Sequence, residues 1–188
     1  MRKITQHYED PASLVWRHAA ERMGMRVVRS AEVNASWDGA GTLTVGTPDT
    51  LDPDDCLPQM ILHETCHALC EGPESVGKLD WGLRNEPDAK VHEHACLRLQ
   101  AALADQHGMR AFFAATTVFR AYYDALPPSP LADGDDPAVT LARAGWERAQ
   151  HGPWAEPLAD ALRRTARLAD AVRDIAPPGS LWRGSPGV

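Results

Sequence analysis

The feature that most constrains the fold is an apolar run with the period of a buried helix, Met60-Ile61-Leu62-His63-Glu64-Thr65-Cys66-His67-Ala68-Leu69-Cys70. Residues four apart on a helix lie on one face, so His63 and His67 present two imidazoles to a single point. Glu64 lies about 100° further round the helix, within reach of a water at that point. Uncompensated His and Glu would be costly inside such a helix, so the run predicts a zinc site with two histidine ligands and Glu64 as the catalytic base. The alternative, two surface histidines beside a solvated Glu64, is disfavoured by the apolar flanks.

A third metal ligand is expected from the next predicted helix. A catalytic zinc site has three protein ligands and keeps a fourth position open. The triplet His92-Glu93-His94 lies near the start of that helix, and its members point about 100° apart, so at most one faces the metal. The apolar stripe of the helix, extended back one turn, favours His92, and the residues alone leave His92, Glu93 and His94 open. A cysteine ligand is a further alternative, but Cys66 lies on the wrong face.

The rest of the pattern predicts an α+β fold, in which a helix and a small sheet of about three strands precede a mostly helical remainder. Apolar and polar residues alternate on both sides of Asp38-Gly39-Ala40-Gly41, a pattern that indicates a hairpin. We expect strands over 26–30, 32–37 and 42–46, and helices over 11–23, from 52 or 58 to 70, 86–106, 109–126, 137–150 and 157–175.

Composition narrows the partners and the compartment. The chain has 188 residues and a net charge of −7, and its arginines are scattered, whereas nucleic-acid binding requires clustered Lys and Arg. No apolar run approaches the roughly 18 residues that span a bilayer, and no signal-peptide pattern follows Met1, so we expect a cytoplasmic protein that contacts neither nucleic acid nor membrane. The four cysteines are expected to be free thiols, with a bridge from Cys66 or Cys70 to Cys96 as the alternative.

The motif His63-Glu64-Thr65-Cys66-His67, followed by an acid on a second helix, resembles the gluzincin zinc metallopeptidases. The order of elements over residues 25–106 is similar to minimal gluzincins and to antirepressor-cleaving metallopeptidases. The resemblance implies a zincin-like domain over 1–126, with 127–188 as a helical extension packed on it. It implies His63, His67 and Glu93 as zinc ligands and Glu64 as general base. It also implies that the strand Thr42–Gly46 is a sheet edge that pairs with an extended peptide or protein substrate.

The function expected from the sequence is therefore that of a zinc-dependent peptidase. One alternative is a zinc hydrolase that acts on a non-peptide amide, and another is a catalytically silent zincin-fold module that binds a partner through its helical second half. Tyr122, Tyr123 or His94 could stabilise an oxyanion, although anchoring of the core is the favoured role for the tyrosines. Asp80, Trp81 and Arg84 lie between the two ligand helices and are expected to border the cleft.

Overall fold

The computed structural model describes residues 3–83, 89–114, 116–132 and 134–184, and within these ranges the chain has an α+β fold. In chain order the elements are α1 (Pro11–Arg22), β1 (Arg26–Ser30), β2 (Ala35–Trp37), β3 (Thr42–Gly46), α2 (Leu57–Glu71), the 3-10 turns η1 (Pro73–Ser75) and η2 (Leu79–Gly82), α3 (Ala89–Asp105), α4 (Arg120–Asp124), α5 (Ala138–His151), α6 (Ala155–Val172) and η3 (Leu181–Arg183). Arg84 and the start of the predicted helix over 86–106 lie outside the described residues.

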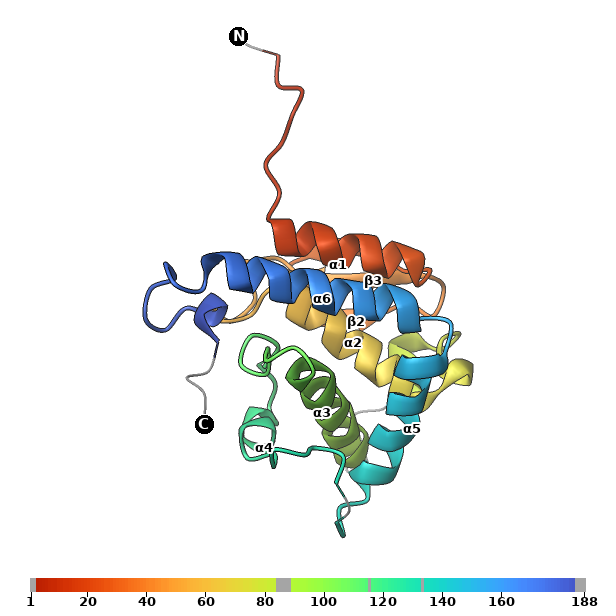
Figure 1. Ribbon diagram of the computed structural model, residues 1–188. Coiled ribbons are helices and arrows are strands. Elements are labelled where there is room, and N and C mark those ends of the chain that lie inside the picture. Colours follow the sequence, from red (N-terminus) through yellow and green to blue (C-terminus); the bar gives the residue numbers. More distant parts are fainter. Residues whose placement is uncertain (1–2, 84–88, 115, 133, 185–188) are drawn as a thin grey trace.

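Helix α2 lies at the centre of the fold, where α1, α3, α5 and the sheet all contact it. Helices α1 and α6 lie side by side on one side of it, and the segment before α1 extends away from the body (Figure 1). Every residue from Leu57 to Cys70 is buried, so α2 has no solvent-facing side along this length. The neighbouring elements must therefore satisfy the polar side chains of the helix.

Helix α2 begins at Leu57, close to the later of its two expected starts. The side chain of Gln59 accepts a hydrogen bond from the backbone N–H of Cys56, the residue that caps the helix, and Pro58 occupies the first turn. A proline is tolerated there because its missing N–H would have no intrahelical partner. The helix ends at Gly72, whose φ of 92° is in the left-handed region that glycine adopts without strain.

The sheet has the strand order β1-β3-β2, with β1 parallel and β2 antiparallel to β3. The expectation that Thr42–Gly46 is an edge strand is therefore wrong, because β3 is central. Leu43 and Val45 on this strand are completely buried, whereas no residue of β1 is. The most buried strand takes the central position, and β2 and β1 form the edges.

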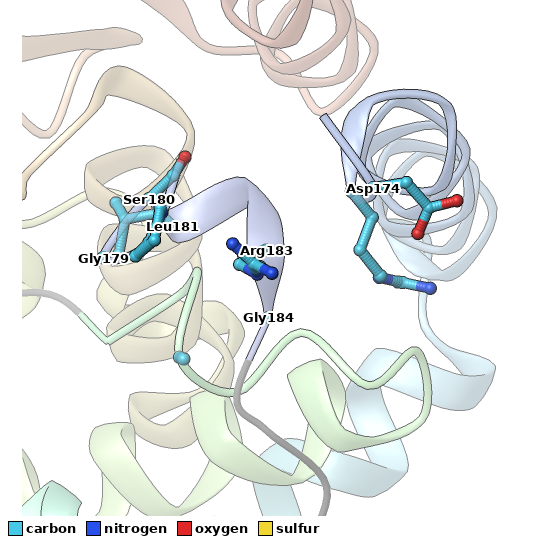
Figure 2. Close-up of a pocket in the computed structure, with 9 residues that line it drawn as sticks. Asp174, Gly179, Ser180, Leu181, Arg183 and Gly184 are labelled. Carbon is cyan, nitrogen blue, oxygen red and sulfur yellow. The ribbon is translucent and has the colours of Figure 1, made fainter. Parts of the chain in front are cut away.

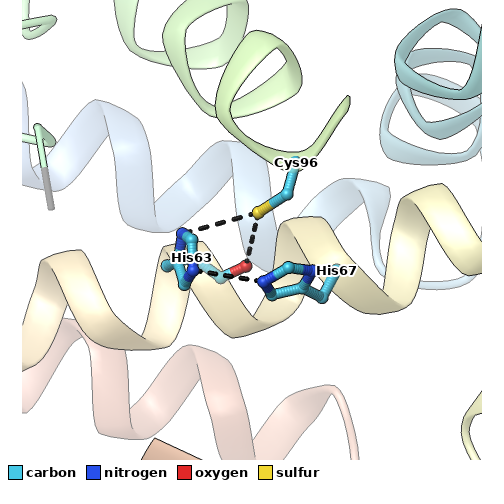
Figure 3. A group of neighbouring side chains, drawn as sticks. All are labelled: His63, His67 and Cys96. Atoms are coloured by element: carbon cyan, nitrogen blue, oxygen red, sulfur yellow. Dashed lines mark hydrogen bonds between the residues drawn. The ribbon is translucent and has the colours of Figure 1, made fainter. Parts of the chain in front are cut away.

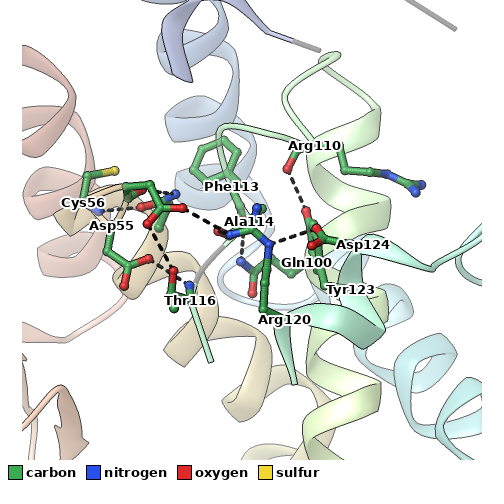
Figure 4. Close-up of polar contacts among 12 residues, drawn as sticks. Asp55, Cys56, Gln100, Arg110, Phe113, Ala114, Thr116, Arg120, Tyr123 and Asp124 are labelled. Atoms are coloured by element: carbon green, nitrogen blue, oxygen red, sulfur yellow. Dashed lines mark hydrogen bonds and ion pairs between the residues drawn. The ribbon is translucent and has the colours of Figure 1, made fainter. Parts of the chain in front are cut away.

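The expected helix over 109–126 is also wrong, because this segment forms turns followed only by the short helix α4. Phe112 and Phe113 are both buried, and the ring of Phe113 packs on the α1 residue Trp16 at a centroid distance of 5.4 Å. Farther on, the backbone N–H of Thr116 donates to the Asp55 carboxylate at 2.8 Å (Figure 4). Burial of the two adjacent aromatic rings and the hydrogen bond to Asp55, just before α2, therefore favour turns here, although the spacing of the apolar residues fits a helix.

The helices after residue 127 share the core of the preceding residues. Helix α5 packs on α2 and α3, and α6 packs on α1. Gly145 of α5 approaches so closely that a Cβ atom there would lie 2.8 Å from a Leu99 side-chain carbon and 3.3 Å from the Cα of Cys70. Within the described residues, no helix combines the length and apolarity needed to cross a membrane.

One buried hydrogen bond joins the two ends of the chain. The indole N–H of Trp16 donates to the hydroxyl of Thr165 on α6 at 2.9 Å, and both residues are completely buried. Thr165→Val keeps the side-chain shape but removes the acceptor, so we expect a loss of about 1–3 kcal/mol in unfolding free energy. Urea denaturation measures it. Thr165→Ser, which keeps the hydroxyl, is the control, and equal losses in the two variants would contradict the role of the hydrogen bond.

Candidate metal centre

The two histidines of α2 converge as their spacing predicts. The Nε2 atoms of His63 and His67 lie 3.1 Å apart, and both residues are buried (Figure 3). Their rings meet edge to face, with centroids 4.6 Å apart. The pair thus points one nitrogen of each ring at a common position beside the helix.

A glutamine on α3 determines which nitrogen of His63 is available. The Gln100 amide nitrogen donates to the carbonyl of Phe113 (Figure 4). The Gln100 oxygen therefore faces His63 Nδ1, at 3.0 Å. A carbonyl oxygen only accepts, so His63 carries its proton on Nδ1 and has a lone pair on Nε2. Metal-binding histidines are commonly oriented in this way by a partner at the other ring nitrogen.

Of the triplet His92-Glu93-His94 on α3, Glu93 is the member that faces the two histidines of α2. Its oxygens lie 3.4 Å from Nε2 of His67 and 3.9 Å from Nε2 of His63. Ligand atoms of a tetrahedral zinc ion lie about 3.3 Å apart, given bonds of about 2.0–2.1 Å, so the three distances are close to such a shell. His92 instead pairs with Glu71 at 2.6 Å, and His94 stacks on Tyr122 at a centroid distance of 3.4 Å.

A cysteine on α3 also reaches the histidines. His63, His67 and Cys96 form a buried group that could hold a metal ion, with ligand atoms all within 4.8 Å of one another (Figure 3). The thiol lies on the Nδ1 side of His63, at 3.5 Å, and donates to the His63 carbonyl at 3.3 Å. Burial raises the pKa of Cys96 well above its usual value, which favours the neutral thiol over the thiolate that binds metals.

Cys96 was not among the residues that the sequence singled out as metal ligands. A usable signal was present, because Cys96 follows Glu93 by three positions and therefore shares its helix face. All four cysteines are free thiols, as expected, and none forms the alternative bridge to Cys96.

Each charged group at the centre changes the pKa of its neighbours. Burial, and then the neighbouring His67, lower the pKa of His63. Burial opposes protonation of His67, but the hydrogen bond and charge of Glu93 raise its pKa overall. Burial alone would raise the pKa of Glu93, yet its interactions with His67 and His63 lower it to about 2. The carboxylate is therefore ionised and stabilises positive charge at the histidine pair. Nδ1 of His67 has no hydrogen-bond partner among the described residues.

Glu64 is buried beside the histidines, and a tryptophan holds its carboxylate. The indole N–H of Trp81 donates to Oε2 of Glu64 at 2.8 Å. The Trp81 ring stacks on Trp37 of β2, with centroids 4.5 Å apart and an interplanar angle of 5°. Trp81, which the sequence placed at the border of a cleft, is thus in direct contact with the expected catalytic base.

The backbone that presents Trp81 is strained. Asp80 and Trp81 have φ values of 45° and 58°, and such left-handed conformations cost non-glycine residues about 1–3 kcal/mol each. Oδ1 of Asp80 accepts from the Ser36 hydroxyl at 2.9 Å and from the Trp37 backbone N–H at 3.0 Å, which fixes the turn to β2. At Gly39, where φ is 72°, a Cβ atom would lie 2.9 Å from the Lys78 carbonyl carbon, so the hairpin packs directly on this turn.

These side chains open onto a cavity of 310 Å³. Its lining includes Glu64, His67, Glu93, Asp80, Trp81 and, from β2, Ala35. The backbone of Asn34 and Asp38 bonds β3, through Gly46 N–H to the Asn34 carbonyl and Asp38 N–H to the Thr42 carbonyl. In an antiparallel pair every second residue bonds the partner strand, so Ala35 lies at a position that does not. The N–H and C=O of Ala35 therefore point away from β3 and along the open edge of the sheet.

The tyrosines considered for oxyanion stabilisation are engaged elsewhere and are not part of the cavity lining. The Tyr122 hydroxyl donates to Asp136 at 2.5 Å, and the Tyr123 hydroxyl donates to the Arg110 carbonyl at 2.9 Å. A larger cavity, of 880 Å³, lies beside η3 and contains Asp174, Ser180 and Arg183 (Figure 2). None of the expected site residues lines it.

No protein-family model, curated protein or solved structure matches the chain. The chemical interpretation of the centre therefore depends on its own geometry. A buried pair of imidazoles with a carboxylate and a thiol nearby offers ligand types that could hold a metal ion.

Exchange of single side chains distinguishes the two possible third ligands. We expect His67→Ala to abolish tight cobalt(II) binding. Glu93→Gln should weaken cobalt binding by more than about 100-fold. Loss of a residue that only orients a ligand typically lowers metal affinity by about 10–100-fold, and loss of a ligand should cost more. Cys96→Ser should lower the affinity less than Glu93→Gln does. Competition titration measures the affinities. The absorption spectrum of the cobalt-loaded native protein should lack a thiolate-to-cobalt charge-transfer band. Such a band, lost in Cys96→Ser, would show instead that Cys96 is the third ligand.

Proposed function

We propose that this protein is a zinc-dependent peptidase whose metal ligands are His63, His67 and Glu93. The observation that carries the proposal is the convergence of these three side chains beside the buried Glu64. Of this group His67, Glu93 and Glu64 line a cavity. The resemblance of the motif to gluzincins supports the same assignment. Glu64 would be the general base, and the cavity would receive the peptide bond to be cleaved.

The donor set fits an open catalytic site better than a closed structural one. The two Nε2 atoms and the Glu93 carboxylate account for three positions, and Cys96 lies on the opposite side of the His63 ring. When bound, zinc would supply Lewis acidity, polarising the scissile carbonyl and lowering the pKa of a water toward about 7. A fourth protein ligand would instead favour the silent binding module.

Within this proposal Glu64 moves the proton. Its Oε2 accepts the Trp81 indole N–H, which leaves Oε1 free for a proton from the attacking water. The carboxylate then passes that proton to the departing amine, so that no charged amide anion has to leave. The water-poor setting of a buried carboxylate strengthens its electrostatic contact with the reacting groups.

The open edge of the sheet supports a peptide as the substrate. The edge next to the cavity is β2, not β3, and Ala35 contributes to the cavity lining. Its outward N–H and C=O can bond an extended peptide backbone, as in other cases of strand addition. The outward N–H of Trp37 is already bonded to Asp80, so the pairing surface on β2 is short.

Glu64→Gln tests the base directly. The variant should bind zinc as the native chain does but lose hydrolysis of fluorescein-labelled casein by about 10²–10⁴-fold, the usual contribution of a general base. Zinc per chain is measured by atomic absorption and turnover by fluorescence release. His67→Ala is the control that loses the metal and the activity together. Full turnover by zinc-loaded Glu64→Gln would refute the mechanism.

Ala35→Pro tests the substrate-pairing edge. Proline removes the outward N–H without breaking a bond to β3, and edge strands tolerate it. We expect kcat/KM for casein to fall by about 2- to 10-fold, the equivalent of one backbone hydrogen bond, mainly through KM. Ala35→Ser keeps the N–H and should match the native chain. An unchanged kcat/KM in Ala35→Pro would show that substrate does not pair with β2.

A further inference from the structure

We propose that Trp81 is a positioning residue that holds the Glu64 carboxylate in its reactive orientation, and that the turn Asp80-Trp81 exists to present it. This inference rests on the proposed function, because it assigns a second residue to the same reaction. The indole N–H of Trp81 donates to Glu64, so it is not available to the substrate.

The geometry leaves the Glu64 side chain little freedom. One oxygen is held at 2.8 Å by a donor whose own residue is only 2 % exposed. The donor ring is clamped in turn, because it stacks on Trp37, and the Trp37 indole N–H donates to the Val76 carbonyl at 2.8 Å. A chain of rigid contacts thus runs from the sheet edge to the carboxylate.

Simple packing does not account for the choice of acceptor. A buried indole N–H needs an acceptor, but elsewhere in this chain neutral groups suffice, the Thr165 hydroxyl for Trp16 and the Val76 carbonyl for Trp37. Trp81 alone of these three donates to a carboxylate, and it reaches that carboxylate only through two successive left-handed residues. Strained backbone maintained by its surroundings is a feature of functional sites.

The anchor of the strained turn is the sheet edge that faces the cavity. Asp80 bonds the Ser36 hydroxyl and the Trp37 backbone N–H, both on β2. Strand β2 therefore orients the general base through Asp80 and Trp81 while its neighbouring residue Ala35 faces the cavity. The substrate-pairing edge and the base belong to one rigid assembly, which fixes the distance between a paired peptide and the carboxylate.

Trp81→Phe tests the inference, because phenylalanine keeps an aromatic ring for the stack on Trp37 but removes the indole N–H. In the zinc-loaded protein we expect kcat for fluorescein-labelled casein to fall by about 10- to 100-fold with KM nearly unchanged, as for a misplaced catalytic group. Zinc per chain should not change. Trp146→Phe, on helix α5 and outside the cavity lining, is the matched control and should keep native kinetics.

A second measurement does not depend on turnover. In a ¹H–¹⁵N spectrum of the zinc-loaded chain, the indole resonance lost in Trp81→Phe identifies Trp81. Glu64→Gln should shift that resonance and speed its hydrogen exchange, and the Trp16 indole should be unaffected. An unmoved Trp81 resonance would overturn the inference, as would native kcat in Trp81→Phe where Glu64→Gln is inactive. If the native chain does not cleave casein, the peptidase proposal fails and the resonance alone decides whether Trp81 holds Glu64.

Discussion

The structure depends on one constraint, the complete burial of a helix that carries polar side chains. From Leu57 to Cys70 no residue of α2 is exposed, yet the helix includes His63, Glu64 and His67. Buried polar groups need partners, and here two neighbouring elements supply them. Helix α3 provides Gln100 and Glu93, and the turn after α2 provides Trp81. The positions of α3 and of this turn thus match the polar side chains of the central helix.

Satisfying that helix also creates its chemistry. Gln100 selects the free nitrogen of His63, and the ionised Glu93 stabilises positive charge where the two rings meet. These are interactions that a fold needs in order to bury imidazoles, and they are equally the interactions that prepare a metal centre. The same reasoning applies to Glu64, whose burial is supported by a single strong donor.

Local pattern was sufficient for α2, for the meeting of His63 and His67, and for the α+β class, because helical period and capping are properties of neighbouring residues. It failed where distant contacts decide. Phe112 and Phe113 fit a helix by spacing but are buried in turns, and β3 became central because strand order depends on which strand is best covered. Periodicity favoured His92, whereas Glu93 contacts the two histidines. Which residue faces α2 depends on how α3 is rotated against it, and the sequence of α3 alone does not give that rotation. The contact of Trp81 with Glu64 requires left-handed backbone, for which Asp80-Trp81 carries no sequence signal.

The far end of α2 has a consequence for how the molecule loses its structure. Arg148 of α5 donates to the carbonyls of Leu69 and Cys70 at 2.5 and 3.1 Å, so a cation from the last third of the chain meets the negative end of the central helix. Opening α5 would uncover those carbonyls as well as the close contact at Gly145. The packing of α5 thus covers polar backbone at the end of α2, so the regions on the two sides of residue 127 stabilise each other.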